Sequence, residues 1–136
     1  MSEQRQLGVD LFNDTWRLIE TRENDSLMID CAHASAYHWA VAPECLPENR
    51  ARSEWLLARV YSLVGREEPA LHHARRCLAL CEAHGLADWD LAFAYEALAR
   101  ASSGGPERRR YVELALSVPI SDADDREQLE NDLATL

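Results

Sequence analysis

Apolar side chains recur at helical spacing along most of the chain, and proline, glycine and polar breaks divide this pattern into seven segments. Pro47 and Pro106 stand where a first helical turn tolerates proline, and Gly85 follows the fourth segment as a left-handed C-terminal cap would. Every break is short, which favours antiparallel neighbours. The pattern predicts three helical hairpins and a last helix, at about residues 9–42, 47–85, 88–118 and 121–136.

Polar residues predict where the last two of these units begin. Asp88 is placed as the N-cap of the third hairpin, and Ser121, with Asp124 three residues on, as the N-cap of the last helix. The last helix has one narrow apolar side of leucines and an acidic outer face, as a solubilising terminal helix should. We expect that side to be buried against the helix at about 106–118, through Leu129, Leu133 and Leu136.

Composition narrows the fold class to all-α. The 136 residues include 20 Ala and 19 Leu, against only 12 Val, Ile and Thr together. Ala and Leu favour helices, whereas β-branched residues favour strands. A chain of this length predicts a single domain over residues 1–136.

The charge disfavours several kinds of partner. The net charge is −10, and all 14 basic residues are arginine, so that no Schiff-base or phosphate-loop lysine exists. An acidic domain is repelled by phosphodiester backbones, and we expect neither nucleic acid nor membrane as a partner. No basic leader or long apolar run occurs, and the four cysteines lie in helix-like sequence. These features predict a cytoplasmic protein with reduced thiols.

An internal repeat suggests how the hairpins are stacked. Leu57-Ala58-Arg59 recurs as Leu98-Ala99-Arg100, at a spacing found in helical-hairpin solenoids. Residues 13–118 resemble the tetratricopeptide repeat, and the second copy matches it in order at Leu57, Ala58, Tyr61, Gly65, Ala70, Ala74 and Leu78. The resemblance implies a short right-handed solenoid-like stack with a concave groove lined by the first helix of each hairpin. The run from His33 to Trp39 is also similar to one in small uncharacterised bacterial proteins, which carry no activity over.

The resemblance implies a peptide-binding surface in that groove. Guanidinium groups bind carboxylates in bidentate fashion, and aromatic rings anchor interfaces. The groove would therefore hold a protein or peptide segment that is acidic or carries a carboxylate. Its residues would be Arg17, Arg52, Trp55, Arg59, Phe93, Glu96 and Arg100. The alternative is that the two aromatic residues belong to the core and the arginines are solvated.

A second candidate site is a polar pocket around His33, Tyr37 and His38. His33 and Tyr37 are i,i+4 neighbours, whereas His38 lies about 140° further round the helix. They could bind a small molecule or metal or transfer a proton, as in a minor enzyme, or they could be ordinary partly buried side chains.

The sequence carries no signature of a metal centre or of catalysis. His73, Cys77, Cys81 and His84 form one stripe that extends ~16 Å along a helix, so that no single ion can reach both ends. One ion could bind two of them with ligands from another helix, but small core residues are the favoured interpretation of the cysteines. No phosphate loop, nucleophile elbow or HExxH motif is present. We expect no metal and no cofactor. The leading hypothesis is a non-catalytic interaction module, and the second is the polar pocket described above. The third is a homo-oligomeric structural protein whose groove is filled by a neighbouring copy.

Overall fold

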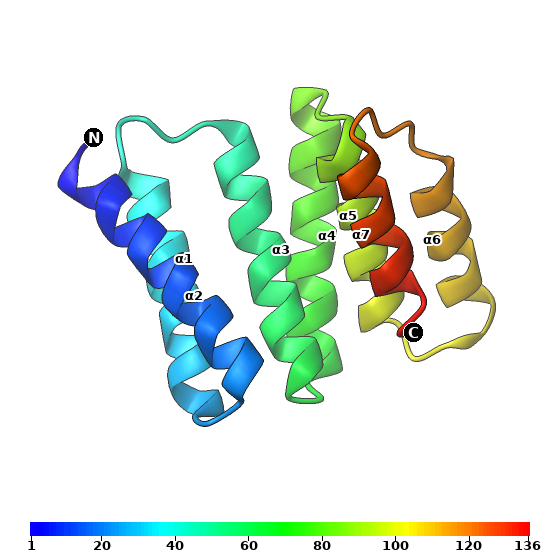
Figure 1. Ribbon diagram of the computed structural model, residues 1–136, viewed down its shortest axis with the longest axis horizontal. Coiled ribbons are helices and arrows are strands. Elements are labelled where there is room, and N and C mark those ends of the chain that lie inside the picture. Colours follow the sequence, from blue (N-terminus) through cyan, green and yellow to red (C-terminus); the bar gives the residue numbers. More distant parts are fainter.

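The computed structural model describes residues 1–136 and contains seven helices and no strand, which confirms the all-α fold (Figure 1). The predicted breaks separate the helices, although several ends differ by a few residues. The helices are α1 (Glu3–Thr21), α2 (Asp25–Val41), α3 (Pro47–Leu63), α4 (Glu67–His84), α5 (Asp88–Ala101), α6 (Gly105–Ser117) and α7 (Ala123–Leu133). None of them combines the length and the apolar character needed to cross a membrane.

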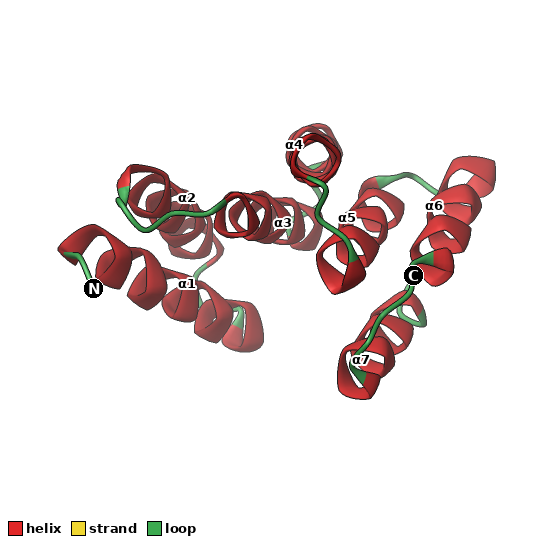
Figure 2. Cartoon of the chain, turned by 90° about the horizontal axis from the view of Figure 1, so that it is seen from above, coloured by secondary structure: helices red, strands yellow, loops and turns green.

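The first six helices pack as consecutive antiparallel pairs. Helix α1 packs against α2, α3 against α4 and α5 against α6, while α3 also contacts α2 and α5. Seen from above, α1 and α7 lie on the same side of α3 and α5, and α4 lies on the opposite side (Figure 2). The arrangement leaves α1 and α7 facing one another across the surface of α3 and α5.

Small residues bring the central helices close together. Ala58 of α3, Ala74 of α4 and Ala97 of α5 form one buried cluster with Leu98, and Ala74 is completely inaccessible to solvent. A second cluster on the same helices contains Ala51, Ala94, Cys77 and Cys81. Alanine and cysteine occupy little space, so helix axes can approach and larger neighbours fill the next layer.

Trp55 of α3 lies where the hydrophobic clusters of the molecule meet. It packs against the α1–α2–α3 cluster, both small-residue clusters and the α5–α6–α7 cluster. Because one side chain contacts all four, it ties the first hairpin to the last helix.

Helix α1 begins six residues before the predicted start. Ser2 is its N-cap and accepts a hydrogen bond from the backbone N–H of Arg5. Gly8, which interrupts the apolar pattern, lies inside the helix because α2 packs closely there. A Cβ at Gly8 would lie 2.8 Å from Cδ1 of Trp39, and the Ser35 hydroxyl donates to the Gly8 carbonyl at 2.8 Å. The glycine is therefore a packing position and not a break.

The predicted N-caps of the third hairpin and the last helix are wrong by one residue each. Asp88 is the first residue of α5, in a left-handed conformation, and Asp122 caps α7 by accepting from the N–H of Asp125. Ser121 instead donates through its hydroxyl to Asp88 at 2.8 Å and through its N–H at 3.2 Å. These two bonds lower the pKa of Asp88. Asp88 and Ser121 therefore connect the start of α5 to the loop before α7, and neither is the N-cap of its helix.

The Asp88–Ser121 contact joins the start of α5 to the loop before α7. Helix α7 packs mainly against α5 rather than against α6, which differs from the expectation that its leucine side covers α6. Leu129 is fully buried in a cluster with Ala92 and Phe93 of α5, although Ala115 of α6 and Val118 complete this cluster. Burial of Leu129 against Ala92 and Phe93 explains why α7 lies along α5. The acidic helix thus becomes a wall beside the first helices.

Candidate functional site: an aromatic groove between α1 and α7

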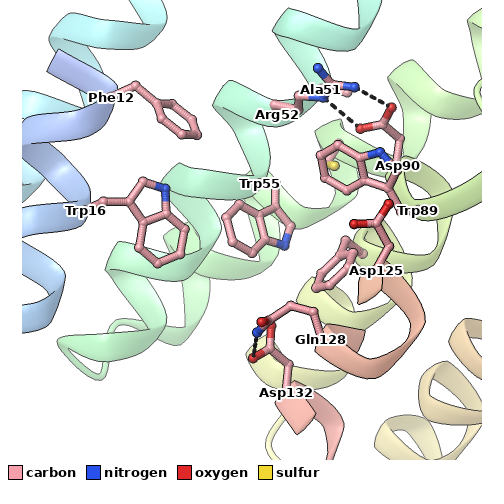
Figure 3. Close-up of a pocket in the computed structure, with 12 residues that line it drawn as sticks. Phe12, Trp16, Ala51, Arg52, Trp55, Trp89, Asp90, Asp125, Gln128 and Asp132 are labelled. Atoms are coloured by element: carbon pink, nitrogen blue, oxygen red, sulfur yellow. Dashed lines mark hydrogen bonds and ion pairs between the residues drawn. The ribbon is translucent and has the colours of Figure 1, made fainter. Parts of the chain in front are cut away.

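The principal cavity of the molecule has a volume of about 450 Å³ and opens between α1 and α7 (Figure 3). Five aromatic rings from three helices, here called the aromatic groove, make up most of its wall: Phe12, Trp16, Trp55, Trp89 and Phe93. Polar and small residues complete the lining, namely Ala51, Arg52, Cys77, Asp90, Asp125, Gln128 and Asp132.

Helical spacing explains how the aromatic groove forms. Phe12 and Trp16 are i,i+4 neighbours on α1, and Trp89 and Phe93 are i,i+4 neighbours on α5, so each pair faces the same way. Trp55 stands between them on α3. Its ring centroid lies 5.7 Å from that of Trp16 and 6.0 Å from that of Phe93. The rings therefore form one continuous apolar surface across three helices.

Arg52 lies in this wall but is already paired. Its guanidinium donates to both carboxylate oxygens of Asp90, at 3.0 and 3.1 Å, and stacks 4.6 Å from the centre of the Trp89 ring. The bidentate pair and the stacked ring fix this arginine in place.

Arg59, Glu96 and Arg100 form an ion network beside the groove. The fully buried Glu96 accepts from Arg100 at 2.7 Å and lies 3.5 Å from Arg59. Arg59 also pairs with Asp132 of α7 at 3.2 Å, and Arg100 donates to the backbone carbonyl of Asp132 and to Thr135. The network joins α3 and α5 to α7.

The seven predicted groove residues thus fall into three groups. Arg52, Trp55 and Phe93 line the cavity. Arg59, Glu96 and Arg100 belong to the ion network. Arg17 pairs with Asp14 at 2.8 Å on the surface, with 61% of its side chain exposed.

Sequence reasoning missed most of the remaining wall. Phe12, Trp16 and Trp89 could have been found from the sequence, because two pairs of aromatic residues, Phe12 with Trp16 and Trp89 with Phe93, have i,i+4 spacing. Asp125 and Gln128 lie on α7, and no local pattern places that helix across α5. Their position depends on the packing of Leu129 against Ala92 and Phe93, which lie more than 30 residues earlier in the chain.

The α7 wall is the acidic side of the cavity. Partial loss of contact with water raises the pKa of Asp125, and the carboxylates of Asp122, Asp88 and Asp124 raise it further. No arginine or histidine lies within ion-pair distance of Asp125. A carboxylate surrounded by other carboxylates marks a region of negative potential.

The only thiol in the wall is poorly suited to nucleophilic chemistry. The pKa of Cys77 is raised well above its ordinary value, most by a hydrogen bond with Cys81 and next by burial. The thiolate is the reactive form of cysteine, and this environment suppresses it.

The three residues of the predicted polar pocket face different neighbours. His33 shares a 2.8 Å hydrogen bond with Tyr61 of α3, and His38 is hydrogen-bonded to Gln4 of α1. The Tyr37 side chain is largely exposed to solvent, at 61%. The structure therefore does not gather these three side chains around one cavity.

His33 belongs instead to a cluster formed by α2, α3 and α4. The His73 ring lies parallel to that of Tyr61, with centroids 5.7 Å apart, and 5.8 Å from the His33 ring. His73 Nδ1 donates to the buried carboxylate of Glu54 at 2.6 Å. Burial lowers the pKa of His33, and the neighbouring His73 lowers it further. No group of three or more residues that could hold a metal ion is found here or elsewhere.

Comparisons with models of known protein families, with curated proteins and with solved structures find no match. The resemblance to the tetratricopeptide repeat therefore depends on the residues that carry it.

Proposed function

We propose that this protein is a non-catalytic interaction module that holds a segment of a partner protein in the aromatic groove. The observation that carries the proposal is the cavity of about 450 Å³ walled by five aromatic rings of α1, α3 and α5. These are the first helices of the three hairpins, the surface that tetratricopeptide-like stacks use for peptides. Aromatic side chains around a concave surface are typical anchors for a partner's apolar side chains.

The chemistry of the wall also favours binding over catalysis. The carboxylate of Asp90 is paired with Arg52, and Cys77 is held as a thiol. No nucleophile with an adjacent base lines the cavity, an arrangement that covalent catalysis requires. A cytoplasmic location is part of the proposal, and the four unpaired cysteines are consistent with it.

Selection from a random peptide library displayed on phage tests the proposal. Selected peptides should bind the parent protein and lose about tenfold or more in affinity when Phe12→Ala removes one ring from the wall. Leu116→Ala is the matched control, because Leu116 is an exposed apolar residue on α6, outside the groove. Circular dichroism and melting show whether each variant is folded.

Two results of this experiment would oppose the proposal. Selected peptides that respond to Leu116→Ala and not to Phe12→Ala would place binding elsewhere. A parent protein that selects no peptide and forms dimers sensitive to Phe12→Ala in sedimentation would show that a second copy fills the groove.

A further inference from the structure

The charge of the groove determines which segments it can hold, given the proposed function. The four arginines predicted to bind a carboxylate all have carboxylate partners within the chain. Arg17 is paired with Asp14, Arg52 with Asp90, Arg59 with Asp132 and Glu96, and Arg100 with Glu96. For Arg59 and Arg100, an acidic partner would have to compete with the buried carboxylate of Glu96, and leaving that carboxylate unpaired costs free energy.

The α7 side of the groove offers the opposite charge. Asp125 lines the cavity without a cationic partner, and the negative charges of Asp122, Asp88 and Asp124 act on it. Of the three acids that line the cavity, Asp90 and Asp132 are paired with arginines and Asp125 is not. A positive group of a partner would find this carboxylate available at no cost in broken pairs.

The aromatic wall provides a second place for a positive charge. Arg52 lies over the Trp89 ring and Arg59 over the Trp55 ring, but no cation of the chain lies over Trp16. Indole faces attract ammonium and guanidinium groups. The two tryptophans of the wall that already hold an arginine show that the groove accommodates this interaction.

We infer that the segment bound in the aromatic groove is apolar and basic, with an aliphatic or aromatic side chain in the cavity and Lys or Arg beside it, facing Asp125 and Trp16. The inference rests on the proposed function and specifies its partner. The sequence predicts an acidic partner segment, and the structure favours a basic one instead. The net charge of −10 would also speed the approach of such a partner.

Three labelled amphipathic peptides of the same length and pattern test the inference by fluorescence anisotropy. One contains leucine and lysine, the second has glutamate in place of lysine, and the third has serine in place of leucine. The leucine–lysine peptide should bind most tightly. Its affinity should fall as salt is raised, because exposed charges are screened.

Substitution of Asp125 identifies where the positive charge binds. Asp125→Asn should weaken the leucine–lysine peptide about two- to fivefold, the range expected for one rim charge, and Asp125→Lys should weaken it further. Glu113→Gln is the matched control, because it removes the same charge from an exposed position on α6. It should leave the affinity within about twofold of the parent.

The outcomes separate this inference from the function on which it rests. Tighter binding of the leucine–glutamate peptide, lost in Phe12→Ala, would overturn the inference and keep the groove as a binding site. If Asp125→Asn and Glu113→Gln weaken the leucine–lysine peptide equally, the attraction depends only on net charge, and the inference is overturned. The same holds if the serine–lysine peptide binds as tightly as the leucine–lysine peptide. If no peptide binds in a manner sensitive to Phe12→Ala, both proposals fail.

Discussion

At Gly8, the absence of a side chain matters as much to the packing as side-chain contacts do elsewhere. Gly8 is buried in α1 under the Trp39 ring, where three ring atoms lie within 3.1 Å of the position of a Cβ. The indole is also covered by the guanidinium of Arg5, 5.9 Å from its centre. The ring has little freedom to move away from an added methyl group.

We expect Gly8→Ala to lower the free energy of unfolding by ~1 kcal/mol. Alanine gains about 1 kcal/mol in a helix interior, but overpacking costs about 1–3 kcal/mol, and the fixed ring makes the cost larger. Chemical denaturation measures the difference. In a Trp39→Leu background the same substitution should become stabilising, and a loss that persists there would exclude the ring as its cause.

We expect His33 to contribute to a pH dependence of stability. Its pKa is lowered by burial and by His73, so the folded state binds its proton less readily than the unfolded state. The contribution of His33 is therefore complete above the unfolded pKa of about 6.5 and is lost as the pH falls through its lower folded pKa.

Denaturation at a series of pH values tests this assignment. We expect His33→Gln to reduce the loss of stability between about pH 7 and 5, relative to the parent. His84, an exposed histidine at the end of α4, provides the control variant His84→Gln. Parallel curves for the parent and His33→Gln would contradict the assignment.

Pairs of helices are held together by small residues, and this level of structure could be predicted. Ala58 and Ala74 match the small positions of the repeat and are buried between α3 and α4. Helical spacing and short breaks located these elements because such signals are local. The start of α1 at Glu3, before the predicted residue 9, was missed because residues 3–8 carry little of the apolar pattern. The position of α7 was missed because its neighbour α5 is distant in sequence.

Ala74→Leu tests the packing of α4 on α3. The larger side chain has no space at this fully buried position, and we expect a loss of ~1–3 kcal/mol in the free energy of unfolding. Ala79→Leu makes the same change at an exposed position of α4 and should have little effect. A protein with Ala74→Leu that melts like the parent would show that this contact is not close.

The candidate site could be predicted only in part, because it combines helices that are distant in sequence. The repeat pattern suggested Trp55 and Phe93, since both lie on first helices. Charge alone suggested a surface of free arginines, but it could not reveal that Asp90, Glu96 and Asp132 would approach them. Ion pairs between residues 38 or 73 positions apart depend on the completed fold.

Over the whole molecule, α7 both covers apolar surface and forms one wall of the groove. Deleting residues 119–136 should expose the side of α5 and α6 that Leu129 covers, and we expect concentration-dependent association in sedimentation velocity. Ser121→Ala removes the hydroxyl contact with Asp88 but keeps Leu129, and it should remain monomeric. A truncated protein that stays monomeric with unchanged melting would contradict the covering role of α7.

The position of Trp55 has a consequence for cooperativity. Hairpins stacked in a row contact only their neighbours and can unfold one after another. Here one indole contacts clusters built by every helix pair and by α7, so removing any hairpin withdraws part of its surroundings. Tryptophan fluorescence and helical circular dichroism should therefore report one coincident unfolding transition. Trp55 therefore both lines the aromatic groove and couples the helix pairs, so that the chain should unfold as a single unit.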